Sequence, residues 1–286
     1  MNKILQKRQL SENVFRIEVE APLIARERRA GQFIILMVDE AMGERIPLTI
    51  ADADPKTGSI SLIFQTVGAT TMKLARLKEG DCIAAVLGPL GRPTSIRGAN
   101  GEPAGRVACV GGGVGLAPLY PIAKALKEAG NQVTIIMGAR NKSLFVMEEE
   151  MRAIAGDNLI LVTDDGSSGR KGLVTDPLKE ICQAGNIDEV IAIGPPIMMK
   201  FCSLTTAPFK IKTTVSLNTI MIDGTGMCGG CRISVGGKTR FVCVDGPEFD
   251  GHQVDWDLMM KRMSAFKPIE AAAREHICNL YKGMDK

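Results

Sequence analysis

The chain has 286 residues, of which 45% are hydrophobic and 23% charged, and this length and balance indicate a globular protein of two domains with a small appendage. A formal net charge of +3 is too small to indicate a nucleic-acid-binding protein, and no apolar run approaches the length of a membrane span. Residues 1–14 lack the apolar stretch of a signal peptide, so we expect a cytoplasmic protein with no membrane partner.

Residues 1–101 are expected to form an antiparallel β barrel. Short β-branched segments separated by glycine and proline turns predict strands over 14–19, 32–38, 46–50, 60–64 and 82–86. One helix is predicted in this region, over 70–77. Because no long helix separates the strands, a small antiparallel barrel is the expected arrangement.

Residues 102–212 change to alternating strands and helices, which predicts an α/β domain with a parallel sheet. The turn-rich stretch at 100–103 marks the expected boundary. The predicted strands cover 106–110, 132–137, 159–162 and 189–193, and the predicted helices cover 116–129 and a segment that opens at Asp176.

Residues 213–286 are dense in glycine, cysteine and turns as far as Gly251, and a helical tail follows. This segment is too short to bury a large core, so a metal site is expected to supply part of its stability. The last helix, from Pro268, repeats apolar residues at helical spacing, for which core packing is the favoured role and a partner interface the alternative.

Three of the eight cysteines are grouped in this third segment. Cys228 and Cys231 are followed by Cys243, and Asp223 precedes Cys228 with four residues between them. The spacing matches the Cys-x4-Cys-x2-Cys pattern of plant-type [2Fe–2S] ferredoxins, with a carboxylate in the first position. Glycines on both sides of Cys228 allow the backbone to wrap a cluster and direct N–H groups to its sulfurs. We therefore predict a [2Fe–2S] cluster held by Asp223, Cys228, Cys231 and Cys243.

Zinc, a disulfide and a structural turn are the alternative interpretations of these residues. Zinc ribbons favour two separated Cys-x2-Cys pairs, and a disulfide is not expected in a reducing compartment. Asp223 is alternatively a turn residue beside Gly224. The isolated cysteines are expected to be small buried hydrophobic residues, and they are Cys82, Cys109, Cys182, Cys202 and Cys278.

Three loops that follow predicted strands of the α/β region are candidates for binding a nucleotide. The glycine loop 111–115 opens a helix, whose N-terminus offers free N–H groups to phosphates. It is not the G-x-G-x-x-G fingerprint, because the spacing differs and Arg140 stands near the place of the expected acidic residue. The loops 163–166 and 194–199 end strands at the same expected edge, so a binding edge is favoured over three separate structural turns.

Taken in order, the motifs of the chain resemble those of the ferredoxin–NADP reductase superfamily over nearly its whole length. They are Arg45-x-Pro47-Leu48-Thr49, Gly68-Ala-Thr70-Thr71, Gly88-Pro-Leu-Gly91, Gly111-Gly-Gly-Val-Gly115 with Pro118, and Gly194-Pro195-Pro196. With the appended cysteines, the chain is similar to the branch that holds the electron-transfer subunit of dihydroorotate dehydrogenase. Asp223 and the surroundings of Asp164 and Cys243 resemble more closely the small subunits of electron-bifurcating NADH-dependent ferredoxin:NADP oxidoreductases, also described as sulfide dehydrogenase subunits.

The resemblance implies an electron-transfer flavoprotein with an FAD-binding barrel, a nucleotide domain and an iron–sulfur segment. The implied FAD contacts are Arg45 at a phosphate, Pro47, Leu48 and Thr49 along the isoalloxazine with the Thr49 hydroxyl in the catalytic position near N5, and Gly68, Thr70 and Thr71 at the phosphates. The implied dinucleotide contacts are Gly113, Gly115, Pro118, Asp164, Asp165, Gly194, Pro195 and Pro196. The relatives favour NAD(H), whereas the charge of Arg140 suits the 2′-phosphate of NADP(H).

The resemblance also implies a heterodimer with a larger, glutamate-synthase-like subunit that carries flavin and [4Fe–4S] clusters. Electrons would pass between NAD(H), FAD, the [2Fe–2S] cluster and this partner, in either direction. The alternatives are the electron-transfer subunit of dihydroorotate dehydrogenase, a stand-alone NAD(P)H–ferredoxin reductase, and a zinc-stabilised interaction module without catalysis.

Overall fold

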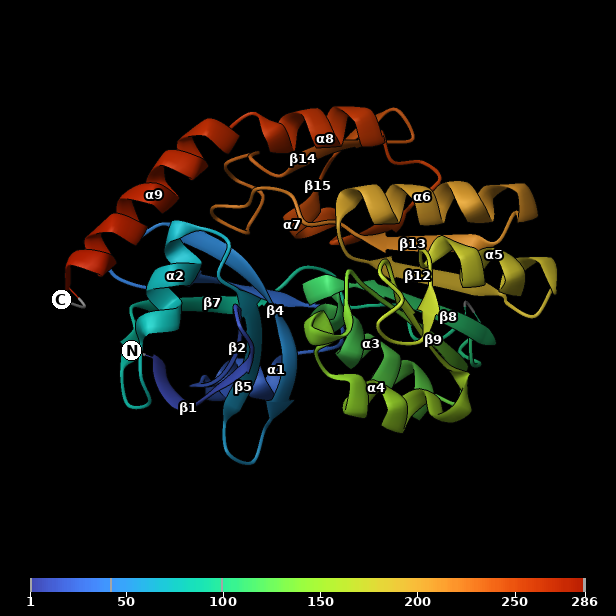
Figure 1. The fold of residues 1–286 in the computed structure, drawn as a ribbon, viewed down its shortest axis with the longest axis horizontal. Coiled ribbons are helices and arrows are strands. Elements are labelled where there is room, and N and C mark those ends of the chain that lie inside the picture. Colours follow the sequence, from blue (N-terminus) through green and yellow to red (C-terminus); the bar gives the residue numbers. More distant parts are fainter. Residues whose placement is uncertain (1, 42, 99, 285–286) are drawn as a thin grey trace.

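The computed structural model describes residues 2–41, 43–98 and 100–284, which form two large sheets, a small hairpin and two C-terminal helices (Figure 1). The strands are β1 (Asn2–Ser11), β2 (Val14–Glu20), β3 (Phe33–Met37), β4 (Arg45–Asp54), β5 (Ser59–Gln65), β6 (Cys82–Ile83), β7 (Ala85–Leu90), β8 (Arg106–Gly112), β9 (Gln132–Ala139), β10 (Leu159–Thr163), β11 (Arg170–Lys171), β12 (Glu189–Ile193), β13 (Lys212–Ser216), β14 (Arg232–Val235), β15 (Lys238–Phe241) and β16 (Glu248–Asp250). The α-helices are α1 (Pro22–Glu27), α2 (Ala69–Arg76), α3 (Leu116–Glu128), α4 (Glu148–Ala155), α5 (Thr175–Gln183), α6 (Pro196–Thr206), α7 (Val242–Asp245), α8 (Trp256–Ser264) and α9 (Lys267–Met284). Four 3-10 turns join them, η1 (Gly113–Gly115), η2 (Lys142–Leu144), η3 (Gly156–Asn158) and η4 (Ala207–Phe209).

The first sheet is the predicted antiparallel barrel, with strand order β6-β1-β2-β5-β4-β3-β7. Its two edge strands are consecutive in the chain, because β6 ends at Ile83 and β7 begins at Ala85. This one segment pairs with β1 at one end and with β3 at the other, so the barrel is nearly closed. The strand predicted over 82–86 is therefore two strands. β1 was not predicted, since Ile4 is the one residue of that strand that is fully buried.

The second sheet confirms the predicted α/β architecture. Its order is β11-β10-β9-β8-β12-β13-β16, and β16 alone pairs antiparallel among its described strands. Helices α3 and α4 cover one face, and α5 and α6 cover the other (Figure 1). The carboxyl ends of β8, β9, β10 and β12 consequently lie along one edge, where open α/β sheets bind ligands.

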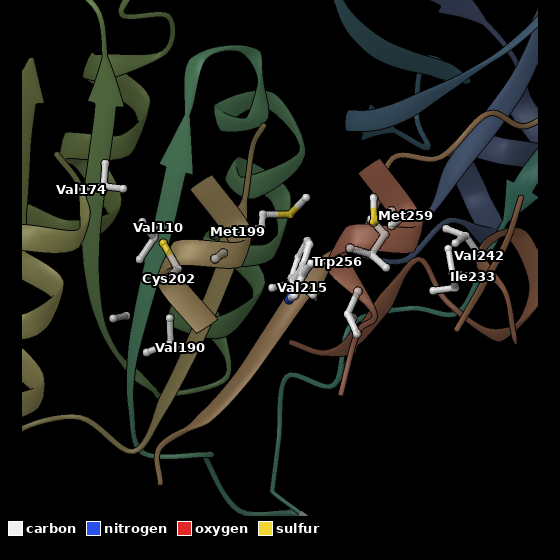
Figure 2. Close-up of a cluster of buried hydrophobic side chains, with 14 of the residues drawn as sticks. Val110, Val174, Val190, Met199, Cys202, Val215, Ile233, Val242, Trp256 and Met259 are labelled. Carbon is white, nitrogen blue, oxygen red and sulfur yellow. The ribbon is translucent and has the colours of Figure 1, made fainter. Parts of the chain in front are cut away.

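The third segment shares its core with the second sheet. β16 adds to β13, with Phe249 opposite Val215. Figure 2 shows the apolar cluster running from Met199 of α6 through Val215 and Trp256 to Val242, without a break between the two parts. The expected metal is therefore not the sole source of order in this segment. The division at 212/213 stays a prediction, and β13 begins at that point.

The last helix differs from its expected role. α9 leaves α8 and reaches α2 on the barrel (Figure 1), where Cys278 contacts Met72 and Arg76 lies over the ring of Tyr281. Ile269 is 67% exposed, so core packing is wrong for the first part of the helix, between the end of α8 and these contacts with α2. None of the helices in the described part of the chain is long and apolar enough to cross a membrane.

The isolated cysteines differ in their burial. Cys109, Cys182 and Cys202 are buried as expected, whereas Cys82 is exposed and Cys278 is half-buried. The expectation is wrong for Cys82 because neighbouring side chains of a strand point to opposite faces, and on β6 it is Ile83 that enters the barrel core.

Candidate functional site

The flavin candidates of β4 separate onto the two faces of that strand. Leu48 packs against the barrel core together with Ile46. Because strand side chains alternate, Arg45, Pro47 and Thr49 share the opposite face, outside the barrel. Register with β3 places Pro47 opposite Ile35 and Thr49 opposite Phe33. Three of the four candidates therefore lie on the outer face of the barrel, whereas Leu48 packs inside it.

A cavity of about 120 Å³ lies on this outer face of the barrel. It is lined by Ile35, Met37, Arg45, Ala85, Leu87 and Asp223. The Asp223 loop reaches it because Gly224 packs directly on the barrel, where an added Cβ would lie 2.7 Å from side-chain carbons of both Ile35 and Leu90. The fold thus brings a flavin candidate and a metal candidate into one cavity.

The N-terminus of α2 is the second flavin candidate. The Thr71 hydroxyl accepts the N–H groups of Val67 and Gly68, both at 3.1 Å, so this side chain caps the helix. Thr70 is buried, and its hydroxyl donates to the Glu44 carboxylate. A carboxylate therefore lies where the resemblance implies phosphates, which agrees with the preference of a helix N-terminus for anions. Sequence reasoning missed Glu44, although it directly precedes Arg45.

The glycine loop after β8 meets the loop after β12. An added Cβ on Gly115 would lie 2.4 Å from the carbonyl oxygen of Ile193, and one on Gly112 would lie 2.5 Å from the Met198 sulfur. Gly113 has a φ of +57°, and nothing lies within 4 Å of an added Cβ there. Two candidate nucleotide loops are therefore in contact, with Gly113 facing open space beside them.

The other nucleotide candidates lie at the ends of β9 and β10. The Asp164 N–H donates to Ala139 at 3.1 Å, and the Asp165 N–H donates to the carbonyl of Arg140 at 3.3 Å. The Ser167 hydroxyl and N–H lower the pKa of Asp165 by hydrogen bonding to its carboxylate. Asp165 is therefore ionised and partly engaged in its own turn, while Asp164 is exposed at the same edge. Pro118 is half-buried in the first turn of α3.

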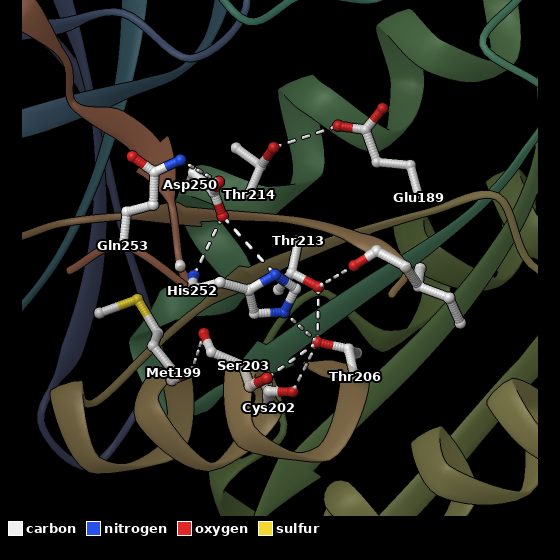
Figure 3. Close-up of polar contacts among 12 residues, drawn as sticks. Glu189, Met199, Cys202, Ser203, Thr206, Thr213, Thr214, Asp250, His252 and Gln253 are labelled. Carbon is white, nitrogen blue, oxygen red and sulfur yellow. Dashed lines mark hydrogen bonds and ion pairs between the residues drawn. The ribbon is translucent and has the colours of Figure 1, made fainter. Parts of the chain in front are cut away.

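Helix α6 links the nucleotide edge to the third segment. It begins at Pro196, directly after the candidates Gly194 and Pro195. At its other end the Thr206 hydroxyl is 2.9 Å from Nε2 of His252, and Figure 3 shows this pair in a network with Thr213. Ion pairing of Lys200 with Asp257 at 2.7 Å adds a second tie, to α8. These polar contacts fix α6 relative to the segment that carries the cysteines.

The four metal candidates lie on two adjoining pieces of backbone. The thiols of Cys231 and Cys243 are both buried and 3.3 Å apart. On the neighbouring loop, the Asp223 carboxylate accepts the N–H of Cys228 at 2.8 Å and that of Thr225 at 3.1 Å. Cys228 is exposed, and its sulfur accepts the Gly230 N–H at 3.4 Å.

This donor set fits an iron–sulfur cluster in its chemistry. Three thiols and a carboxylate are present, and N–H groups already point at two of the sulfurs, Cys228 and Cys231. Burial raises the pKa of Cys243, with the adjacent Cys231 thiol as a further cause, so deprotonation has to accompany metal binding. Across the described ranges no three His, Cys, Asp or Glu side chains converge closely enough to hold a single metal ion. The Asp223–Cys228 loop would therefore have to close on the buried thiol pair.

Comparisons with known families agree with this layout. The model of the iron–sulfur cluster binding domain of dihydroorotate dehydrogenase B matches residues 218–255, and that of the oxidoreductase NAD-binding domain matches residues 109–203. The first range contains all four metal candidates, and the second contains the candidates from Gly113 to Pro196. These matches confirm the expected fold class, in which an α/β nucleotide-binding part is followed by an iron–sulfur-binding segment.

Individual proteins resemble the chain over nearly its whole length. It is 48% identical over 96% of its residues, and 95% of the relative, to a Thermotoga maritima protein named as a homologue of the dihydroorotate dehydrogenase B (NAD(+)) electron transfer subunit. It is 31% identical over 89% of its residues, and 97% of the relative, to the electron transfer subunit itself from Desulforamulus reducens. A solved structure of the NADH-dependent reduced ferredoxin–NADP oxidoreductase, studied for flavin-based electron bifurcation, matches with 45% identity and a TM-score of 0.89, covering 97% of this chain and 98% of that one.

Proposed function

The chain belongs to the family of dihydroorotate dehydrogenase B electron-transfer subunits and their homologues, and from this membership we propose that it passes electrons between NAD(H), FAD and a [2Fe–2S] cluster. FAD, when bound, would connect the two-electron chemistry of a nicotinamide with the one-electron chemistry of the cluster. The protein's own part is to place the three groups and to keep water away from the route between them.

The shared cavity of Arg45 and Asp223 carries this proposal. A reductase without a cluster needs no metal-binding loop beside its flavin strand. Here the loop is packed on β3 and β7 through Gly224, so a cluster held by Asp223 would adjoin a flavin held by β4. A short separation of this kind favours electron transfer between the two groups.

We assign the binding roles as follows. Arg45 and the N-terminus of α2, with Gly68, Thr70 and Thr71, hold the FAD phosphates, and Pro47, Leu48 and Thr49 hold the flavin ring, with Thr49 at its reactive edge. The glycines of η1 with Pro118, and the loops at Asp164 and Gly194, hold NAD(H). Arg140, at the same edge, is available to a 2′-phosphate. The metal ligands are Asp223, Cys228, Cys231 and Cys243.

The chain is proposed to work in a heterodimer with a larger subunit, and we propose a glutamate-synthase-like partner with flavin and [4Fe–4S] clusters. Met227, next to Cys228, is 89% exposed, and Ile222 and Val244 are exposed near it. An exposed apolar rim around the cluster loop suits contact with another protein rather than with water.

The test begins with anaerobic purification of the chain and analysis of its metal, sulfide and flavin. The proposal expects bound FAD, iron and acid-labile sulfide, and bleaching of both chromophores by NADH. A colourless protein with zinc and no flavin would overturn it in favour of a structural module. Affinity capture from the native cells, with mass spectrometry, then identifies the partner.

A role in pyrimidine synthesis, with dihydroorotate dehydrogenase as partner, is the second candidate. The 31% identity to the Desulforamulus reducens subunit supports this candidate, but the 45% identity to the ferredoxin–NADP oxidoreductase chain ranks it second. Asp223 argues against this second candidate, because the first ligand position of the pattern is usually a cysteine and is a carboxylate in this chain. Recovery of dihydroorotate dehydrogenase in the capture experiment would establish this second function.

A further inference from the structure

The segment 91–94 follows the last barrel strand and lies between the barrel and the loop that carries Cys243. On the barrel side, Gln32 donates from Nε2 to the Gly91 carbonyl at 2.9 Å, and the Thr94 N–H donates to Ala30 at 2.9 Å. Thr94 is 8% exposed. The segment is therefore fixed to the barrel at both of its ends.

On its other side the same segment holds the backbone that follows Cys243. The Arg92 N–H donates to the Gly246 carbonyl at 2.7 Å, and the Arg92 side chain donates from Nε to the Val244 carbonyl at 3.2 Å. The Arg92 guanidinium also lies 3.8 Å from the Asp245 carboxylate. Val244 and Asp245 directly follow Cys243 in the chain.

Thr94 makes a fourth contact between this segment and the backbone that follows Cys243. Its hydroxyl donates to Oε1 of Glu248 at 2.5 Å, at the start of β16. The space is tight, because a Cβ added to Gly31 would lie 2.2 Å from the Thr94 hydroxyl and 3.1 Å from the same Glu248 oxygen. One side chain is thus hydrogen-bonded to β16 while its own backbone is hydrogen-bonded to the barrel.

We propose that Arg92 and Thr94 are positioning residues that brace the Cys243 loop against the barrel and so set the spacing between the flavin and the cluster. This inference rests on the proposed function for its consequence, but the brace itself is a property of the protein without cofactors. The Asp223 side of the cluster loop is held by direct packing of Gly224 on β3 and β7. On the Cys243 side, Val242 and Cys243 are buried in the cluster that contains Phe33 and Ile35, and the hydrogen bonds of Arg92 and Thr94 add directional contacts to this packing.

The brace predicts which step a variant affects. Thr94→Val removes the hydroxyl with little change of shape, and Arg92→Gln removes the guanidinium. Each variant is expected to slow transfer from flavin to cluster while reduction of the flavin by NADH stays unchanged, because neither residue belongs to the proposed flavin or nucleotide contacts. Thr94→Ser restores the hydroxyl and is expected to restore the rate.

The deciding measurement is hydrogen exchange of the 243–248 segment in cofactor-free protein. Loss of a buried hydrogen bond of this kind corresponds to roughly tenfold faster exchange for Thr94→Val, and a smaller change for the exposed Arg92 side chain. Arg97→Gln is the matched control, since Arg97 lies in the same linker but donates to Gly101 within the linker. Circular dichroism confirms that each variant is folded.

The outcomes separate the two proposals. Faster exchange in 243–248 for Thr94→Val and Arg92→Gln, normal exchange for Thr94→Ser and Arg97→Gln, and a selective loss of cluster reduction support the brace. Unchanged exchange in both variants overturns it, whatever cofactors bind. A wild-type protein that binds neither FAD nor iron refutes the proposed function, and the exchange result still decides whether the brace exists.

Discussion

Arg45 on β4 and Asp223 on the loop before Cys228 line the same cavity, although the first belongs to the barrel and the second to the C-terminal segment. Within the described ranges no ion pair joins these two side chains, and the Asp223 carboxylate accepts the N–H groups of Thr225 and Cys228 instead. The arrangement places the iron–sulfur segment against the outer face of the barrel, at the proposed flavin site, rather than apart from it.

The first prediction concerns the buried thiol pair, Cys231 and Cys243. Cys243→Ser is expected to lower bound iron and sulfide by more than about tenfold, because a hydroxyl is a far poorer ligand than a thiolate at this position. Bound FAD is expected to stay unchanged. Cys82→Ser, at an exposed cysteine on β6, serves as the control. Equal iron content in the two variants would remove Cys243 from the ligand set.

Asp223 has two candidate roles that its variants can separate. As a turn residue it accepts N–H groups of Thr225 and Cys228, and these bonds lower its pKa, so the carboxylate is ionised and also able to bind metal. We expect Asp223→Asn to lose or alter the cluster even though its amide oxygen keeps one turn bond, and Asp223→Cys to retain a cluster with a changed electron paramagnetic resonance spectrum. Wild-type spectra from the Asn variant would leave only the turn role.

The fold was predictable in outline because strand and helix periodicities in this chain are local. The barrel and the parallel sheet follow from such patterns, and α2 over Ala69–Arg76 lies within one residue of its predicted 70–77 range. β1 was not predictable because its outward face is polar and only Ile4 is deeply buried. β16 was not predictable either, since a three-residue strand leaves no periodic pattern.

The candidate site was predictable as motifs but not as an assembly. Spacing alone identified Asp223 and the three cysteines as one set, and turn chemistry identified the glycine loops. Contacts between distant segments, such as Thr70 with Glu44 or Thr94 with Glu248, are set by tertiary packing that no local pattern records. The exposure of Ile269 was also missed, because helical periodicity cannot tell a buried face from one without a partner.

Gly113 offers a test of the nucleotide edge with a closely matched control. Gly113 and Gly156 have the same φ of +57°, and neither would bring an added Cβ within 4 Å of another atom. Replacing either by alanine is expected to cost about 1 kcal/mol or more of unfolding free energy, because both positions have a positive φ that disfavours a residue with a Cβ. Only Gly113→Ala is expected to weaken NADH binding, measured by fluorescence titration, since Gly156 lies in η3 just before the start of β10, at the edge opposite the carboxyl ends of the strands. Equal NADH affinity in both variants would remove Gly113 from the nucleotide site.

Glu248 makes stability depend on pH. Burial raises the pKa of this half-buried carboxyl to about 7, with Glu189 raising it further and the hydrogen bond from Thr94 and the charge of Lys212 opposing the rise. A glutamate in the unfolded chain titrates near 4.5, so between the two values the folded state holds a proton that the unfolded state has lost. Stability is therefore expected to be greatest below that window and to fall as the pH rises through it.

The fall attributable to Glu248 is at most about 3 kcal/mol, from 1.36 kcal/mol per unit of pKa, and water at the half-buried side chain reduces it. Urea unfolding of the cofactor-free protein between about pH 5 and about pH 8 measures it against Glu248→Gln, which cannot ionise but keeps an oxygen for the Thr94 hydroxyl. The variant is expected to lose less stability than the wild type over this range, so that the two curves converge at low pH and separate at high pH. Parallel curves would show that Glu248 titrates at its ordinary pKa and that its contact with Thr94 does not make the free energy of unfolding depend on pH.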